Sequence, residues 1–156
     1  MEHITSQLTE LVFVWRLLIA AVFGAVLGLE RSIAGKHAGM RTYALVALGS
    51  CLFTSLGVMA SYQYIDFVGV NPLQLAGFII VGIGFIGSGL SVFRGEHPVE
   101  LTTASGIWMV AGVGIACGFG LYLTALGATV LGLLIFSLLS SVEWQISRKY
   151  GLKHEE

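Results

Sequence analysis

The chain reads Gly-Leu-Glu-Arg-Ser-Ile-Ala-Gly-Lys-His-Ala-Gly-Met-Arg-Thr from Gly28 to Thr42, between two long apolar runs. Charge is concentrated in this stretch, which holds Glu30, Arg31, Lys36, His37 and Arg41. Gly35 and Gly39 allow the backbone to turn, because glycine has no Cβ and adopts conformations that other residues avoid. We therefore predict that residues 28–42 form a cytoplasmic hinge between two membrane helices.

Composition places the chain in the class of integral membrane proteins. Apolar residues make up 56% of the 156 residues and charged residues 11%, and the mean hydropathy is +0.87. No polar segment is long enough to fold separately, so we expect a single all-α membrane domain over residues 1–156. The net charge of −1 gives no basis for nucleic-acid binding, whereas contact with a lipid bilayer is expected.

Five apolar segments are predicted to cross the membrane, because about 20 helical residues span a hydrocarbon core of roughly 30 Å. The predicted spans cover residues 11–29, 43–60, 73–93, 102–117 and 121–142. The last two come from one uncharged run over residues 102–142, about twice the length of one span. We therefore place a turn at Gly118-Phe119-Gly120, and a re-entrant fourth segment is the alternative.

Lys and Arg set the predicted orientation, because cytoplasmic loops of membrane proteins carry an excess of them. With five full spans, seven of the eight basic residues lie on one side: Arg31, Lys36, Arg41, Arg94, Arg148, Lys149 and Lys153. We predict that the N-terminus is outside and the C-terminus cytoplasmic. A re-entrant fourth segment would place the basic tail outside. Arg16 lies in the other half, where we expect its side chain to snorkel to the nearer surface.

Two sets of glycines are expected to bring helix backbones together. Gly24 and Gly28 are four residues apart and share one face of the first span. The centre of the third span is richer in glycine than helix propensity favours, with Gly82, Gly84, Gly87 and Gly89. Both sets are therefore candidates for close helix packing.

Four carboxylates lie at the predicted cytoplasmic ends of the spans: Glu30, Glu96, Glu100 and Glu143. Glu30 falls at the negative pole of its own helix and needs a cationic partner, for which Arg31 and Arg41 are the candidates. One interpretation is that Glu30 and Glu100 bind a hydrated Mg²⁺, which needs only one or two carboxylates and several waters. The other is an ion-pair cluster without a metal.

Threonines are expected to cap the second and fourth helices, whose N-termini point to the same region. Thr42 precedes one helix and Thr102 and Thr103 precede the other. The positive ends of two helix dipoles favour an anion or a carboxylate, and Glu30 could dock there without any ligand. The candidate functional cluster is therefore Glu30, Arg31, Arg41, Thr42, Glu100, Thr102 and Thr103.

Four blocks of sequence stand in a distinctive order. They are Gly28-Leu-Glu-Arg31, Lys36-His-Ala-Gly-Met-Arg-Thr42, Gly82-Ile-Gly-Phe-Ile-Gly-Ser-Gly89 and Leu101-Thr-Thr-Ala-Ser-Gly-Ile-Trp108. In order and spacing they closely resemble the membrane domain of the MgtC/SapB family, over most of the chain. The resemblance implies a bacterial inner-membrane protein linked to magnesium limitation, which in some members restrains the ATP synthase.

The chain also departs from the pattern of that family. Members carry Asp-Pro-x-Arg and then a Gln at the start of the third span, where this chain has Asn71-Pro-Leu-Gln74 and then Phe78. An acid and a base beside the glycine-rich helix are therefore missing. We also expect no C-terminal soluble domain, although many relatives carry one.

The function that we predict is a role in magnesium homeostasis or in adaptation to low magnesium. A Mg²⁺ transporter proper is one alternative, and a regulator that binds another membrane complex, such as the ATP synthase, is the other. We expect no enzyme, because no nucleophile with a base and an orienting group is visible. Self-association is expected, most simply as a dimer, and Mg²⁺ is the one candidate ion.

Overall fold

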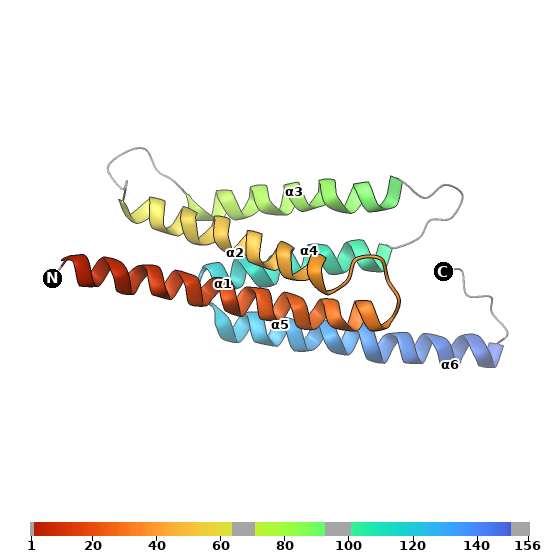
Figure 1. Ribbon diagram of the computed structural model, residues 1–156. Helices are drawn as coiled ribbons and strands as arrows, with labels where there is room; N and C mark the ends of the chain where they lie inside the picture. The colour runs from red at the N-terminus through yellow and green to blue at the C-terminus, as the bar shows by residue number, and fades with distance from the viewer. Residues whose placement is uncertain (1, 64–70, 93–100, 151–156) are drawn as a thin grey trace.

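The computed structural model describes residues 2–63, 71–92 and 101–150, which form a bundle of helices (Figure 1). Helix α1 covers Glu2–Ile33, α2 Met40–Gln63, α3 Pro72–Val92 and α4 Leu101–Gly118. The last long helix consists of α5 (Tyr122–Leu134), a π-helical turn η1 (Ile135–Leu139) and α6 (Ser140–Tyr150). No strand occurs in this part of the chain, and the all-α prediction is confirmed.

Among the described residues, five helices are long and apolar enough to cross a membrane. They span Glu10–Ile33, Met40–Tyr62, Pro72–Gly89, Leu101–Gly118 and Tyr122–Lys149. The fourth is a full helix of 18 residues, about 27 Å at a rise of 1.5 Å per residue, a length that favours a full span over a re-entrant segment. The chain is a multi-pass membrane protein.

The helices extend beyond the predicted spans. α1 begins at Glu2 instead of residue 11, and the last helix continues to Tyr150 instead of ending at residue 142. A formed helix propagates at low cost into polar sequence, because each added residue gains one backbone hydrogen bond. Hydropathy therefore predicts the length inside the hydrocarbon and not the helix ends.

α4 is the central helix. It packs against α1, α2, α3 and α5, and 56% of its span is buried, whereas 11% of the α3 span is buried. α1 and α2 lie side by side, and α3 lies at the edge against α2 and α4 (Figure 1). The α1–α2 turn, the start of α4 and η1 lie toward the same end of the bundle, and α6 extends past it (Figure 1). We call this end the hinge end.

Glycines with positive φ make two of the turns. Gly35 has a φ of +70° in the hinge, and Gly120 has a φ of +79° between α4 and α5. This left-handed region strains residues that carry a Cβ. The predicted turn at residues 118–120 is therefore present, and it separates the fourth and fifth spans.

Glycines at the centre of the bundle let α2 approach its neighbours. A Cβ on Gly24 would lie 2.5 Å from the carbonyl oxygen of Tyr43, and one on Gly28 would lie 2.6 Å from the Cα of Met40. Three glycines of α4, for which close packing was not predicted, have similarly close neighbours on α2: Gly106, Gly114 and Gly118. Glycine thus sets the spacing of α2 against both α1 and α4.

The glycines of α3 behave differently. A Cβ on Gly82, Gly84 or Gly89 would meet no atom within 4 Å, and one on Gly87 would lie 3.8 Å from the Ala104 Cβ. Among the described residues the expected close approach is therefore not made, because α3 lies at the edge of the bundle. It stays a prediction about contacts with another molecule.

The snorkelling of Arg16 stays a prediction, and its side chain is half-buried against the C-terminus of α4. Its Nη1 donates to the carbonyl oxygen of Gly118 at 2.7 Å, and its guanidinium lies 5.3 Å from the centroid of the Phe13 ring. The last carbonyls of a helix lack partners within it and carry partial negative charge, so a cation is stabilising there. Arg16 thus links α1 to the C-terminus of α4.

Candidate functional site

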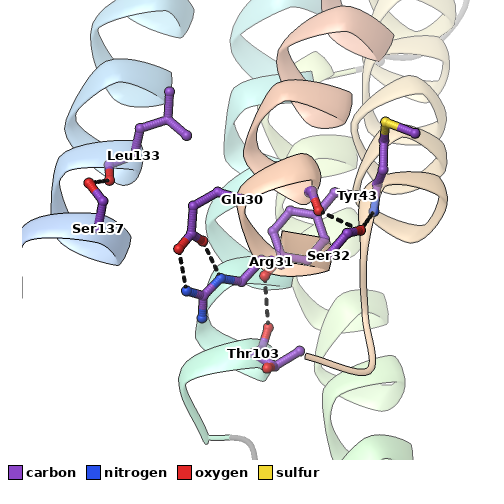
Figure 2. A network of polar contacts seen from close by, with 9 residues as sticks. Glu30, Arg31, Ser32, Tyr43, Thr103, Leu133 and Ser137 are labelled. Atoms are coloured by element: carbon purple, nitrogen blue, oxygen red, sulfur yellow. Dashed lines mark hydrogen bonds and ion pairs between the residues drawn. The ribbon is translucent and has the colours of Figure 1, made fainter. Parts of the chain in front are cut away.

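Glu30 and Arg31 form an ion pair in the last turns of α1 (Figure 2). The Arg31 Nε donates to one carboxylate oxygen at 2.5 Å, and Nη2 donates to the other at 2.9 Å. Such two-point pairing is stronger and more directional than a single charged hydrogen bond. The Arg31 side chain is 4% exposed and that of Glu30 is 21% exposed, so the carboxylate is the part of the pair that meets solvent.

Phe136 covers the buried guanidinium. The Cζ of Arg31 lies 4.1 Å from the centroid of the Phe136 ring, within the range of a cation–π contact. Phe136 belongs to η1 and is itself buried. A π-turn holds one more residue than an α-helical turn, so it changes the direction of the side chains that it carries. Phe136 thereby joins the end of α1 to the last helix.

Tyr43 and Gly106 complete the packing at the hinge end. Tyr43 is fully buried, and its hydroxyl donates to the carbonyl oxygen of Thr103 at 3.4 Å (Figure 2). A Cβ at Gly106 would collide with the Tyr43 hydroxyl and the Phe136 ring. Glycine at this position therefore leaves room for two aromatic rings, which bring α1, α2, α4 and η1 together.

Ser32 holds the start of α2 against the end of α1. Its hydroxyl donates to the carbonyl oxygen of Gly28 at 3.0 Å and accepts from the backbone N–H of Met40 at 3.0 Å (Figure 2). The N–H groups of a first helical turn have no partner within the helix, so this bond satisfies one of them. The hinge is thus closed by a side chain from α1.

The expected threonine caps are not in cap positions. α2 begins at Met40, which places Thr42 inside its first turn, and α4 begins at Leu101, which places Thr102 and Thr103 inside that helix. α2 begins three residues and α4 one residue before the predicted span. Ser32 takes over the capping at α2.

The structure brings together only part of the predicted cluster. Glu30 pairs with Arg31 and not with the N-termini of α2 and α4, whereas Arg41 and Thr102 are exposed. Thr103 is buried and joins the site through its backbone carbonyl. Glu100 lies outside the described residues, as do Glu96 and Arg94. Within the described residues, no three His, Cys, Asp or Glu side chains could hold a metal ion together.

Sequence reasoning missed three members of the site: Ser32, Tyr43 and Phe136. Ser32 directly follows Arg31 and Tyr43 lies two positions after Arg41. This closeness in sequence to the charged residues was the signal that could have identified them. Phe136 lies 105 positions after Arg31 in an uncharged run, where nothing marks it among other apolar residues. Only the packing of the last helix on α1 shows its role.

Several hydroxyls inside the spans bond to carbonyl oxygens of their own helices. The Thr54 hydroxyl donates to the Ser50 carbonyl oxygen at 2.8 Å, and the Thr129 hydroxyl donates to that of Ala125 at 2.8 Å. Ser88 donates to its own helix and is exposed. A cavity of about 550 Å³ between α2 and α3 is lined by apolar side chains such as Leu45, Phe53 and Ile79, with Ser50 as a polar exception. The described bundle thus offers no row of acidic groups across the membrane.

Comparison with known proteins places this architecture in a family. The family model described as MgtC family matches residues 17–145. The chain belongs to the MgtC family. The match includes the hinge, α2 to α5 and η1, and therefore every element that builds the Glu30–Arg31 site.

Three relatives show which share of longer MgtC-family proteins this chain covers. It is 34% identical over 142 residues to the "Putative magnesium transporter YhiD" of Escherichia coli K12. The aligned region covers 88% of this chain and 65% of that protein. It is 37% identical over 138 residues to protein SapB of Bacillus subtilis 168, covering 85% and 57%. It is 35% identical over 136 residues to protein MgtC of Salmonella typhimurium LT2, covering 87% and 56%.

The chain therefore spans between 56% and 65% of the length of these relatives. No solved structure matches it. The shared region is the membrane bundle, so the activities of the longer proteins come to this chain only as proposals.

Proposed function

We propose that this chain acts in magnesium homeostasis in a bacterial inner membrane, as a regulator that works at its hinge end. The name of the Escherichia coli relative supports the link to magnesium. The distribution of Lys and Arg supports an N-terminus outside and a hinge end in the cytoplasm. In this proposal the chain is a single membrane domain that associates with a second copy and carries out no catalysis.

The observation that carries the proposal is the Glu30–Arg31 pair beneath Phe136. Its carboxylate reaches solvent, whereas its guanidinium is buried. A hydrated Mg²⁺ binds through one or two carboxylates and keeps several waters, so Glu30 presents suitable chemistry at the surface. A cation at Glu30 competes with Arg31, and a buried Arg31 without its partner is unfavourable. Ion availability would thus be coupled to the packing of α1 against the last helix.

Conduction through the bundle is the alternative that the geometry favours less. Mg²⁺ gives up its water reluctantly, so it needs a wide aqueous path or acidic ligands along the way. Several hydroxyls within the described spans bond to their own helices, those of Tyr43 and Ser55 bond to carbonyl oxygens of α4, and the cavity between α2 and α3 is lined by apolar side chains. The missing acid and base at Asn71 and Gln74 point in the same direction.

Growth at limiting magnesium tests the proposal. A bacterial strain that lacks its own MgtC-family protein is complemented with the wild-type chain, Glu30→Gln, Arg31→Gln or Arg41→Gln, with protein levels in the membrane matched by immunoblot. We expect the wild type and Arg41→Gln to restore growth and the other two variants to fail. Full restoration by Glu30→Gln would show that the pair is not the functional site. An effect of the wild type that is independent of magnesium would overturn the proposed role.

A further inference from the structure

α6 has no neighbouring helix along most of its length in the part of the chain that the structure describes. Among the described helices it packs only against η1, from which it continues. Its apolar side chains are open to the surroundings, with Val142 48%, Trp144 55% and Ile146 48% exposed. Figure 1 shows α6 extending past the other described helices at the hinge end. The question is what surrounds this segment in the cell.

The length of the last helix sets the depth of α6 in the membrane. Tyr122 and Trp144 are separated by 22 positions, about 33 Å at a helical rise of 1.5 Å per residue. This distance matches the hydrocarbon thickness of roughly 30 Å, and Tyr and Trp favour the two boundaries between hydrocarbon and headgroups. If Tyr122 marks one boundary, the helix length places Trp144 at the other boundary, on the hinge end, and residues 145–150 at the level of the lipid headgroups.

The charges of α6 fit that layer. The Cζ of Arg148 lies 5.5 Å from the centroid of the Trp144 ring, so the cation is held next to the boundary residue. Lys149 is exposed beside it, and Glu143 is the only acid in Ser140–Tyr150. Arg148 and Lys149 lie about 6 to 8 Å beyond Trp144, at the level of headgroup phosphates. A basic segment beside a membrane is attracted to anionic lipid by about 1 kcal/mol per Lys or Arg.

We propose that α6 is an interfacial anchor that binds the phosphates of anionic phospholipids through Arg148 and Lys149, with Trp144 packed at the hydrocarbon boundary. The partner of α6 is a lipid surface, because its side chains change from apolar to basic along the helix. This change falls where a membrane changes from hydrocarbon to charged headgroups. η1 allows the helix to change direction before it enters this layer, since π-turns bend helices. The inference does not depend on the role in magnesium homeostasis.

Lipid retention and the fluorescence of Trp144 test the anchor. Trp15 and Trp108 are replaced by Phe, so that Trp144 is the only tryptophan of the chain. The full chain is placed in nanodiscs of phosphatidylcholine alone or with one third phosphatidylglycerol, and phospholipids that stay bound after extraction are counted by native mass spectrometry. Arg148→Gln/Lys149→Gln is compared with Lys36→Gln/Arg41→Gln, which removes two cations at the same end but outside α6.

We expect the α6 variant to lose at least half of the retained phosphatidylglycerol, and the hinge variant to keep it. Trp144 should be quenched most by lipids labelled near the headgroup, and its emission should shift to the blue with phosphatidylglycerol at low salt and less at high salt. Equal retention by both variants would overturn the proposal. So would a Trp144 that is quenched only by labels on a second copy of the chain, which would show a protein contact in place of lipid. If the α6 variant does not fold, the fluorescence of Trp144 in the single-tryptophan protein with unchanged Arg148 and Lys149 still distinguishes a lipid contact from a protein contact.

Discussion

Glu30 and Arg31 are neighbours in the sequence, yet their surroundings differ. The guanidinium is buried under Phe136, whereas the carboxylate keeps contact with solvent. Removing one partner of a buried pair costs up to about 3 to 5 kcal/mol, because the other charge is left without compensation. The cost is smaller for a pair that is partly exposed, since water screens the remaining charge.

Glu30→Gln should therefore lower the free energy of unfolding more than its own exposure suggests, because it leaves Arg31 buried and unpaired. The double variant Glu30→Gln/Arg31→Met should recover part of the loss, since methionine keeps an apolar stem beneath Phe136. Denaturant unfolding in detergent measures the difference. Arg41→Gln is the matched control and should change stability by less than about 0.5 kcal/mol, as an exposed cation at the same end. A double variant no more stable than Glu30→Gln alone would contradict the pairing argument.

The sequence predicted that Glu30 needs a cationic partner, but it did not predict which arginine is that partner. A carboxylate at the negative pole of a helix requires a cation, and from the sequence alone either Arg31 or Arg41 could supply it. The choice depends on which side chain faces the bundle, and that follows from the packing of Phe136 and Gly106. Contacts between residues so far apart in the sequence leave no local pattern.

At the scale of helices, two kinds of glycine can be distinguished. Gly114 faces Ala47 and Ser50 of α2 so closely that a Cβ would collide, whereas Gly84 faces open space. Replacing glycine by alanine raises helix propensity by about 1 kcal/mol, but crowding a packed interface costs about 1 to 3 kcal/mol. The sign of the effect should therefore differ between the two positions.

Gly114→Ala should lower the melting temperature of the monomer in detergent, and Gly84→Ala should leave it unchanged or raise it. Gly84→Leu separates lipid from protein contact on α3, because a large side chain would disrupt a close contact between copies. Size-exclusion chromatography with light scattering reads the oligomer. A smaller particle for Gly84→Leu supports association through α3, and an unchanged particle shows that this face meets only lipid. Equal losses for both alanine variants would contradict the distinction.

Helices were the most predictable level of the structure. Five spans and the turn at residues 118–120 follow from apolar length and from glycine. The ends, the caps and η1 do not, because backbone hydrogen bonding carries a helix through polar residues and because Ser32 acts across the hinge. Glycine content likewise indicates close packing without saying whether the partner lies inside the chain.

For the whole molecule, the orientation in the membrane is the prediction on which the functional argument depends. The two native cysteines, Cys51 and Cys117, are buried, which makes labelling of introduced cysteines specific once both are replaced by alanine. In intact cells, an impermeant thiol reagent should label Asp66→Cys and should label Lys36→Cys only after the membrane is opened. The reverse pattern would place the hinge end outside and would remove the proposed cytoplasmic role of Glu30.

In our proposal the chain acts at its hinge end and does not carry magnesium across the bilayer by itself. Purified protein in liposomes loaded with a magnesium-sensitive dye tests it directly, with empty liposomes and Glu30→Ala measured in parallel. We expect an uptake rate equal to that of empty liposomes for both proteins, because the acidic residues of the described spans lie toward their ends and leave the middle of the bilayer without ligands for an ion that holds its water strongly. Rapid, saturable uptake by the wild type that Glu30→Ala abolishes would contradict the account and would make the chain a transporter.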